Sequence, residues 1–155
     1  MTKYMLLSGL ACLSACASTS PVPATETPSS VSEPIEYSLP AQTLEPGKCG
    51  LFLWTRDEPR HFVLFFSAGD AKAEAILDGR RHTLRVDSQD GDVFGQFLTR
   101  MAFSKQDGGA VTLTLAPGEE IDGGRRVPLA RMIYDNAEGW EIITPLTGLT
   151  ACQPE

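Results

Sequence analysis

The feature that most constrains the fold of this chain is a series of short runs in which apolar and polar residues alternate. The clearest run covers residues 80–87, with His82, Leu84 and Val86 on one face and Arg81, Thr83 and Arg85 on the other. Successive side chains of a strand point to opposite faces, so a period of two predicts a strand whose first face points inward. No segment of the folded region keeps a helical period, and the sequence therefore predicts an all-β fold.

The expected strands are separated by clusters of glycine, aspartate and proline. They cover residues 50–54, 61–67, 71–77, 80–87, 93–104, 110–116, 127–134 and 140–146. Alanines in 71–77 also suit a helix, but the Asp78-Gly79 that follows is a strong hairpin signal and favours a strand. About eight short strands predict a small antiparallel barrel, closed or nearly closed, with a sandwich as the alternative.

Four local expectations refine this scheme. The cluster at 88–92 predicts a turn, and Gly95 predicts a bulge in the strand that follows. Pro128 predicts that the strand at 127–134 lies at an edge, because proline lacks the N–H that a central strand donates. Trp54 and Trp140, each next to a turn, are expected to cover the core at a barrel end rather than to form an exposed contact patch.

The N-terminus combines Lys3, a short apolar stretch and Leu13-Ser14-Ala15-Cys16. The stretch is too short to span a bilayer, and small residues precede the cysteine as a signal peptidase requires. This arrangement resembles the lipobox of bacterial lipoproteins; an ordinary secretory signal cut near Ala17 is the alternative. The resemblance implies that residues 1–15 are a signal peptide and that Cys16 is acylated, for example with palmitate. The resemblance also implies that Ala17 after the cysteine favours the outer membrane, with the protein facing the periplasm or the cell surface.

Residues 16–43 are predicted to be a lipid anchor and a disordered tether, because proline, serine, threonine and glutamate dominate this segment. Ile35, Tyr37 and Leu39 alternate with polar neighbours, so the end of the tether has an alternative as a docked edge strand. The folded domain is expected to cover residues 44–155. Cys12 leaves with the signal and Cys16 takes the lipid, so Cys49 and Cys152 are left to form one disulfide in an exported protein.

Charge and residue content disfavour several functions. The whole chain has a net charge of −7, and the predicted mature protein −8, which disfavours nucleic acid as a partner. No serine sits in a Gly-x-Ser-x-Gly elbow, and with the cysteines committed no thiol nucleophile remains. His61 and His82 stand too far apart in sequence for a typical zinc motif. We therefore predict a protein that is not an enzyme and that holds no metal or cofactor.

The charged clusters have mostly structural interpretations. Asp87, Asp90 and Asp92 depart from the order of a calcium loop and are expected in a solvated turn. Glu119, Glu120 and Asp122 are expected as loop charges rather than as paired acids of a glycosidase. Arg80-Arg81 and Arg125-Arg126 are expected to pair with nearby acids, with binding of a carboxylate-bearing ligand as the alternative.

Residues 73–105 also resemble the bacterial lipoproteins that inhibit C-type lysozyme. The resemblance is in the order of features: a strand into Leu77-Asp78-Gly79, a Ser88…Gly91…Phe94 loop, and Phe103-Ser104-Lys105 before the next strand. In that family two loops enter the cleft of the enzyme, and their counterparts by position would be Ser88 and Lys105. Ser88 is not followed by the family's glycine, and Gln106 replaces its turn glycine. The resemblance implies a barrel of eight strands with a disulfide.

Together these features predict an envelope lipoprotein whose β-domain is a non-enzymatic interaction or structural module with a protein partner. The alternatives are an inhibitor of C-type lysozyme, with Ser88 and Lys105 as contact residues, and a carrier of a small apolar ligand. The carrier hypothesis depends on the apolar richness of residues 61–67 and 93–103.

Overall fold

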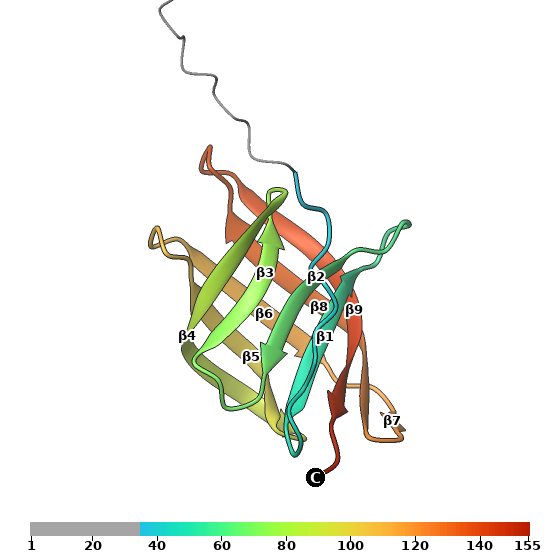
Figure 1. The fold of residues 1–155 in the computed structure, drawn as a ribbon. Helices are drawn as coiled ribbons and strands as arrows, with labels where there is room; N and C mark the ends of the chain where they lie inside the picture. Colours follow the sequence, from blue (N-terminus) through green and yellow to red (C-terminus); the bar gives the residue numbers. More distant parts are fainter. Residues whose placement is uncertain (1–34) are drawn as a thin grey trace, which may run out of the picture. The chain divides into compact units, whose positions relative to one another are not determined.

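The computed structural model describes residues 35–155. The predicted signal peptide, Cys16 and the first part of the predicted tether lie outside the described residues. The described chain is all-β (Figure 1). Its strands are β1 (Cys49–Thr55), β2 (Phe62–Ser67), β3 (Lys72–Leu77), β4 (Arg80–Phe94), β5 (Phe97–Ser104), β6 (Ala110–Ala116), β7 (Glu120–Ile121), β8 (Gly124–Asp135) and β9 (Glu141–Cys152).

Eight of these strands close into an antiparallel barrel, as the spacing of the alternating runs predicted. Strands β1 to β6 pair in sequence order, β6 pairs with β8, β8 with β9, and β9 returns to β1. The short β7 pairs only with β8 and lies outside the ring. Closure leaves every strand of the ring with two neighbours, which removes the unpaired edges of an open sheet.

The predicted disulfide is present and fastens the two ends of the barrel domain. Cys49 opens β1, Cys152 ends β9, and the two residues face each other in the β1–β9 register. Their sulfur atoms are 2.01 Å apart across 103 positions of sequence. The first and last strands of the ring are thus joined both by hydrogen bonds and by a covalent bond.

The hairpin between β3 and β4 also follows its sequence. Asp78 and Gly79 both have positive φ, 50° and 70°, as a two-residue type I′ turn requires. This turn fixes the register in which Ala75 faces His82 and Ala73 faces Leu84. The alanine-rich segment before it is a strand, and Leu84 points into the barrel as predicted while His82 is half-buried on the same side.

The turn predicted at residues 88–92 is absent, because β4 continues to Phe94. Two bulges, after Val86 and after Asp90, absorb the extra residues of this segment. Within it, the Asp90 carboxylate accepts a hydrogen bond from the Gly91 N–H at 2.6 Å. The reversal comes at Gly95, the first residue of a two-residue turn between Phe94 and Phe97, with φ of 61°. The predicted turn and the predicted bulge have therefore exchanged places.

Two further expectations are corrected by the barrel. Pro128 does not mark an edge: β8 pairs with both β6 and β9, and the proline sits in a bulge between Val127 and Ala130, where no ladder N–H is needed. Trp140 does not cover the core, since it lies 71% exposed next to the β8–β9 turn. Trp54, by contrast, is partly buried and packs against the core, with its ring stacked on that of Phe52.

The barrel interior is filled by large apolar side chains. The ring of Phe66 contacts those of Phe97 and Phe103 edge-on, with centroids 6.0 and 5.9 Å apart. The largest fully buried side chains are those of Phe66, Phe97, Phe103, Leu51, Leu53, Leu64, Leu77, Leu84, Met101, Leu113, Met132 and Leu146. Side chains of this size pack the centre of a small barrel.

Residues 35–48, which we call the strap, run along the outer wall over β1 and β2 before entering β1 (Figure 1). The strap forms no strand, but the Glu36 N–H donates to the Gly79 carbonyl at 2.8 Å and the Leu39 N–H to the Phe62 carbonyl at 2.7 Å. Leu39 is buried, and the described part of the predicted tether thus packs on the barrel.

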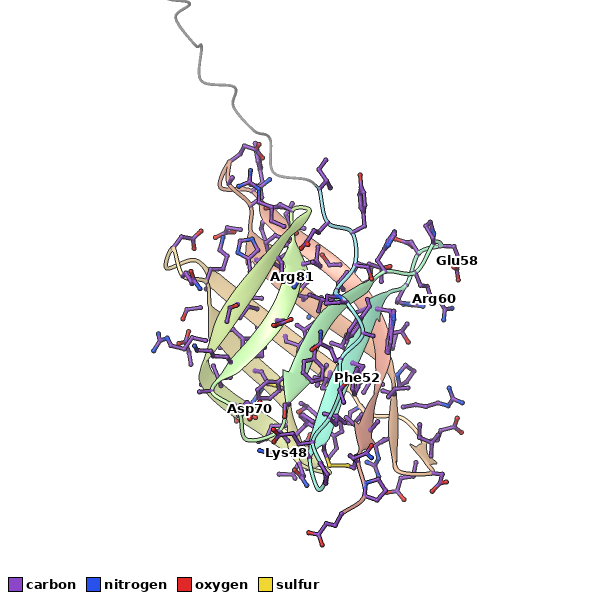
Figure 2. All side chains as sticks on the ribbon, in the orientation of Figure 1. Lys48, Phe52, Glu58, Arg60, Asp70 and Arg81 are labelled. Carbon is purple, nitrogen blue, oxygen red and sulfur yellow. A yellow bond between two sulfur atoms is a disulfide. The ribbon has the colours of Figure 1, made fainter. Side chains whose placement is uncertain are left out.

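The strap accounts for the nearly continuous apolar sequence of β2. Phe52, Trp54, Phe62 and Phe65 form a cluster of contacting rings in β1 and β2. A bulge that leaves Val63 unpaired brings Phe62 opposite Trp54. Figure 2 shows Phe52 on this wall of the barrel. The strand is apolar on both faces because one face packs into the barrel and the other carries this cluster.

Candidate functional site: a groove on the outer wall

One hollow of the described surface, which we call the main hollow, lies on the outer wall of β3, β4 and β5. It has a volume of about 550 Å³ and is lined by Lys72, Thr83, Arg85, Ser104, Lys105, Gln106 and Gly108. A hollow of about 320 Å³ adjoins it through Thr83 and Gln106, and one of about 230 Å³ through Lys72 and Thr83. We call these three hollows together the outer groove.

The alternation that builds the barrel also builds the floor of this groove. In β4, Leu84 points inward, so Thr83 and Arg85 point outward. The registers place Lys72 of β3 opposite Arg85, and Arg85 opposite Ser104 of β5. The three outward side chains therefore lie side by side across three strands.

The ends of the groove come from segments outside the regular ladder. Gln106 and Gly108, in the β5–β6 turn, line one end of it. Gln42 of the strap and Phe65 of β2 line the other end. With neighbouring strands ~4.8 Å apart, the distance from β5 to β2 is about 15 Å. The groove is thus elongated across the strands.

The lining of the main hollow is cationic although the chain is acidic. Lys72, Arg85 and Lys105 line it, and no aspartate or glutamate does. At its edge the Arg85 guanidinium is 2.9 Å from the Asp87 carboxylate. The Ser104 hydroxyl links the two, accepting from Arg85 at 3.2 Å and donating to Asp87 at 3.1 Å. Within residues 35–155, Lys72 makes no ion pair, although Asp70 and Glu74 line the adjoining hollow together with it.

Lys105, a predicted partner-binding residue, lines the groove but is held by its own turn. Its side chain is 12% exposed, and its Nζ donates to the Asp135 carbonyl at 3.2 Å and lies 3.6 Å from Asp107. The Gly109 N–H donates to the Asp107 carboxylate, which is the main reason that the pKa of this carboxyl is lowered. The Lys105 amine is therefore engaged rather than presented to a partner.

Ser88, the other predicted contact residue, is exposed in β4 next to a bulge and pairs with Ala102. It does not line the outer groove. The loop that the inhibitor resemblance places here is part of a long strand. The structure therefore does not bring Ser88 and Lys105 into one hollow.

His82 lies at the same end of the barrel as the turn that carries Lys105, and it lines the second hollow together with Asp107. Burial is the main cause that lowers the pKa of His82, and the positive charge of Lys105 lowers it further. Nearby, the Tyr134 hydroxyl donates to the Asp78 carboxylate at 3.2 Å, which ties β8 to the β3–β4 turn.

The remaining predicted clusters take structural roles in the described residues. Arg81 lies 3.3 Å from Glu36 of the strap, Arg126 lies 2.8 Å from Glu119, and Arg125 pairs with Glu120. Among residues 35–155, no three histidine, cysteine or acidic side chains gather where they would hold a metal ion.

Sequence reasoning did not identify Lys72, Thr83 or Gln106 as site residues. It placed Thr83 and Arg85 on the outward face, which was the available signal. The hollow itself depends on how the β5–β6 turn and the strap rise beside the sheet, and no local pattern encodes this.

Comparisons with protein-family models, with curated proteins and with solved structures give no significant match to this chain. In the part of the chain that the structure describes, there is no helix of the length and apolarity needed to cross a membrane.

Proposed function

We propose that this protein is a lipid-anchored module of the bacterial envelope that binds a protein partner through the outer groove and performs no catalysis itself. The observation that carries the proposal is the position of the main hollow: it lies on the outer wall, whereas the barrel interior is filled by side chains such as Phe66, Phe97 and Phe103. The hollow's volume of about 550 Å³ lies in the range of ~300–1,000 Å³ that is usual for small-ligand pockets.

The anchor part of the proposal is supported by the lipobox-like Leu13-Ser14-Ala15-Cys16. We expect metabolic labelling with palmitate to mark the full chain and Cys16→Ser to abolish the label, because the thiol accepts the acyl chain. Unchanged labelling of the Cys16→Ser variant, or an unlabelled wild-type chain, would remove the anchor from the proposal. In the labelled protein the expected location is the outer membrane.

The groove part is tested by photo-crosslinking in cells that carry the full chain. A photoreactive residue at Gln106, on the groove, should form an adduct with a protein, whereas one at Arg60, on the β1–β2 hairpin, should not. Figure 2 shows Arg60 beside Glu58 at the tip of that hairpin. Thr83→Trp fills the floor of the groove and should suppress the Gln106 adduct. Adducts at both positions, or an adduct that Thr83→Trp leaves unchanged, would contradict a groove-bound partner.

Inhibition of C-type lysozyme is the second candidate, favoured by the eight-stranded barrel and its disulfide, which the family resemblance implies. The engaged Lys105 argues against it, because the resemblance implies that the corresponding residue enters the cleft of the enzyme. A molar excess of full chain should leave lysozyme activity intact if the groove proposal holds. Near-stoichiometric inhibition that Lys105→Ala relieves would favour the inhibitor instead.

A further inference from the structure

We propose that the segment bound in the outer groove is acidic and extended, with one of its carboxylates paired to Lys72. This inference rests on the proposed function and specifies the chemistry of the partner. It starts from the contrast between the chain, with a net charge of −7, and its main hollow, whose lining contains only cationic and neutral side chains.

Lys72 is the cation that a ligand would meet first. Arg85 is partly neutralised by Asp87 and Lys105 by Asp107, but Lys72 has no acidic partner within the described residues. An unpaired ammonium in a concave surface attracts an anion more strongly than the same charge on a convex one, because low-dielectric walls focus its field. The net negative charge of the rest of the chain repels an anionic ligand elsewhere on the surface, which favours its binding at Lys72.

The shape and the polar groups of the groove favour a polypeptide segment. A length of about 15 Å accommodates roughly five residues of an extended chain at ~3.3 Å per residue. The lining offers the hydroxyl of Thr83 and the amide of Gln106, which both donate and accept hydrogen bonds, whereas the Ser104 hydroxyl is engaged by Arg85 and Asp87. Groups that both donate and accept match the N–H and C=O groups of an extended backbone.

The end of the groove beside the strap adds a further preference. Gln42 of the strap, Phe65 and Ala73 border the smallest hollow, next to Lys72. Glu74 and Asp70 also line this hollow, so a carboxylate is disfavoured there. The favoured segment therefore carries its acidic residue near Lys72 and an apolar or neutral residue toward the strap.

The test measures binding of labelled octapeptides to the full chain in zwitterionic detergent micelles. The probes are an alternating glutamate–serine peptide, an alternating lysine–serine peptide, and a galacturonate octamer as a non-peptide polyanion. We expect the acidic peptide to bind best. Raising the salt concentration from 50 to 500 mM should lower its affinity severalfold, because exposed charges are screened.

Lys72→Glu should lower the affinity for the acidic peptide about tenfold. Arg60→Glu changes the net charge by the same amount, but on the β1–β2 hairpin, where Arg60 pairs with Glu58 at 3.1 Å. This control should leave the affinity within twofold. Equal effects of the two variants would overturn the inference, because binding would then depend on the net charge of the chain and not on Lys72.

The inference and the proposed function fail in different ways. If Thr83→Trp suppresses the cellular crosslink at Gln106 but Lys72→Glu does not, the groove binds a partner that is not acidic, and only the inference falls. If neither variant matters, the proposed function falls too. Tighter binding of the galacturonate octamer than of the acidic peptide would replace the polypeptide with an anionic glycan and so overturn the inference.

Discussion

At the scale of single residues, hydrogen bonds at the end of the barrel join segments that are distant in sequence. The Tyr134 hydroxyl is the clearest case, because it links β8 to Asp78 in the β3–β4 turn. Tyr134→Phe should lower the free energy of unfolding by about 1–2 kcal/mol, since the ring stays and only the hydroxyl is lost. Denaturant unfolding at pH 7 measures the change. Identical midpoints for the variant and the wild type would show that the bond contributes nothing net.

His82 gives the barrel a dependence on pH. Burial, reinforced by Lys105, lowers its pKa in the folded state below the value of 6.5 of the free side chain. The unfolded chain therefore binds a proton before the folded chain does, and stability falls as the pH drops below about 6.5. The lowered pKa values of Asp90 and Asp107 act at more acidic pH, below their reference value of 3.8.

We accordingly expect His82→Gln to flatten the fall in stability between pH 7 and pH 5. The measurement is the urea midpoint at several pH values in that window for both proteins. His61→Gln is the matched control for the substitution itself. Parallel slopes for His82→Gln and the wild type would assign the dependence to other groups.

At the scale of elements, Gly148 in β9 allows the close approach of β9 and β1 that closes the barrel. A Cβ at this position would overlap the carbonyl oxygen of Phe52 in the neighbouring strand. Gly148→Ala should cost about 1–3 kcal/mol of stability, because an added methyl forces the strands apart. Calorimetry on this variant and on Thr112→Ala, an exposed position in β6, makes the comparison. A loss no larger than that of Thr112→Ala would refute the steric argument.

The strap is the second element whose contribution can be measured. Leu39 is 5% exposed although it lies outside every strand. Leu39→Ala should cost about 2–3 kcal/mol, toward the lower end for a buried leucine, because a surface strap relaxes more easily than the core. Increased binding of a hydrophobic dye to this variant would report that the aromatic cluster of β1 and β2 has become exposed. Tyr37→Ala, at a position 63% exposed, should have little effect on stability.

At the scale of the whole molecule, the disulfide closes a loop that includes almost the entire barrel. Linking residues 103 positions apart restricts the unfolded chain, and the entropic model gives about 4.7 kcal/mol for a loop of about 100 residues. The double variant Cys49→Ala, Cys152→Ala should lose about 3–5 kcal/mol and keep its far-ultraviolet spectrum. A loss below 1 kcal/mol would mean that residual pairing of the β1 and β9 segments already restricts the ends of the unfolded chain without the disulfide.

The sequence by itself determined the class of this fold, most of its strands and its disulfide. These properties are local or nearly so: the alternation in residues 80–87 sets which side chains face inward, Asp78-Gly79 sets a hairpin, and two remaining cysteines pair. The same reasoning failed at residues 88–92 and at Pro128, because aspartate, glycine and proline mark bulges as readily as turns or edges. Neighbouring strands decide between these outcomes.

Only the tertiary structure decided where the groove lies and which side chains enter it. Lys72 and Ser104 are brought beside Arg85 by the registers of two strand pairs, and the strap and the β5–β6 turn provide the ends. The same held for Lys105, whose amine is taken up by the Asp135 carbonyl thirty positions away. A hollow is a relation between segments distant in sequence, whereas a pattern along the chain specifies only the direction of each side chain.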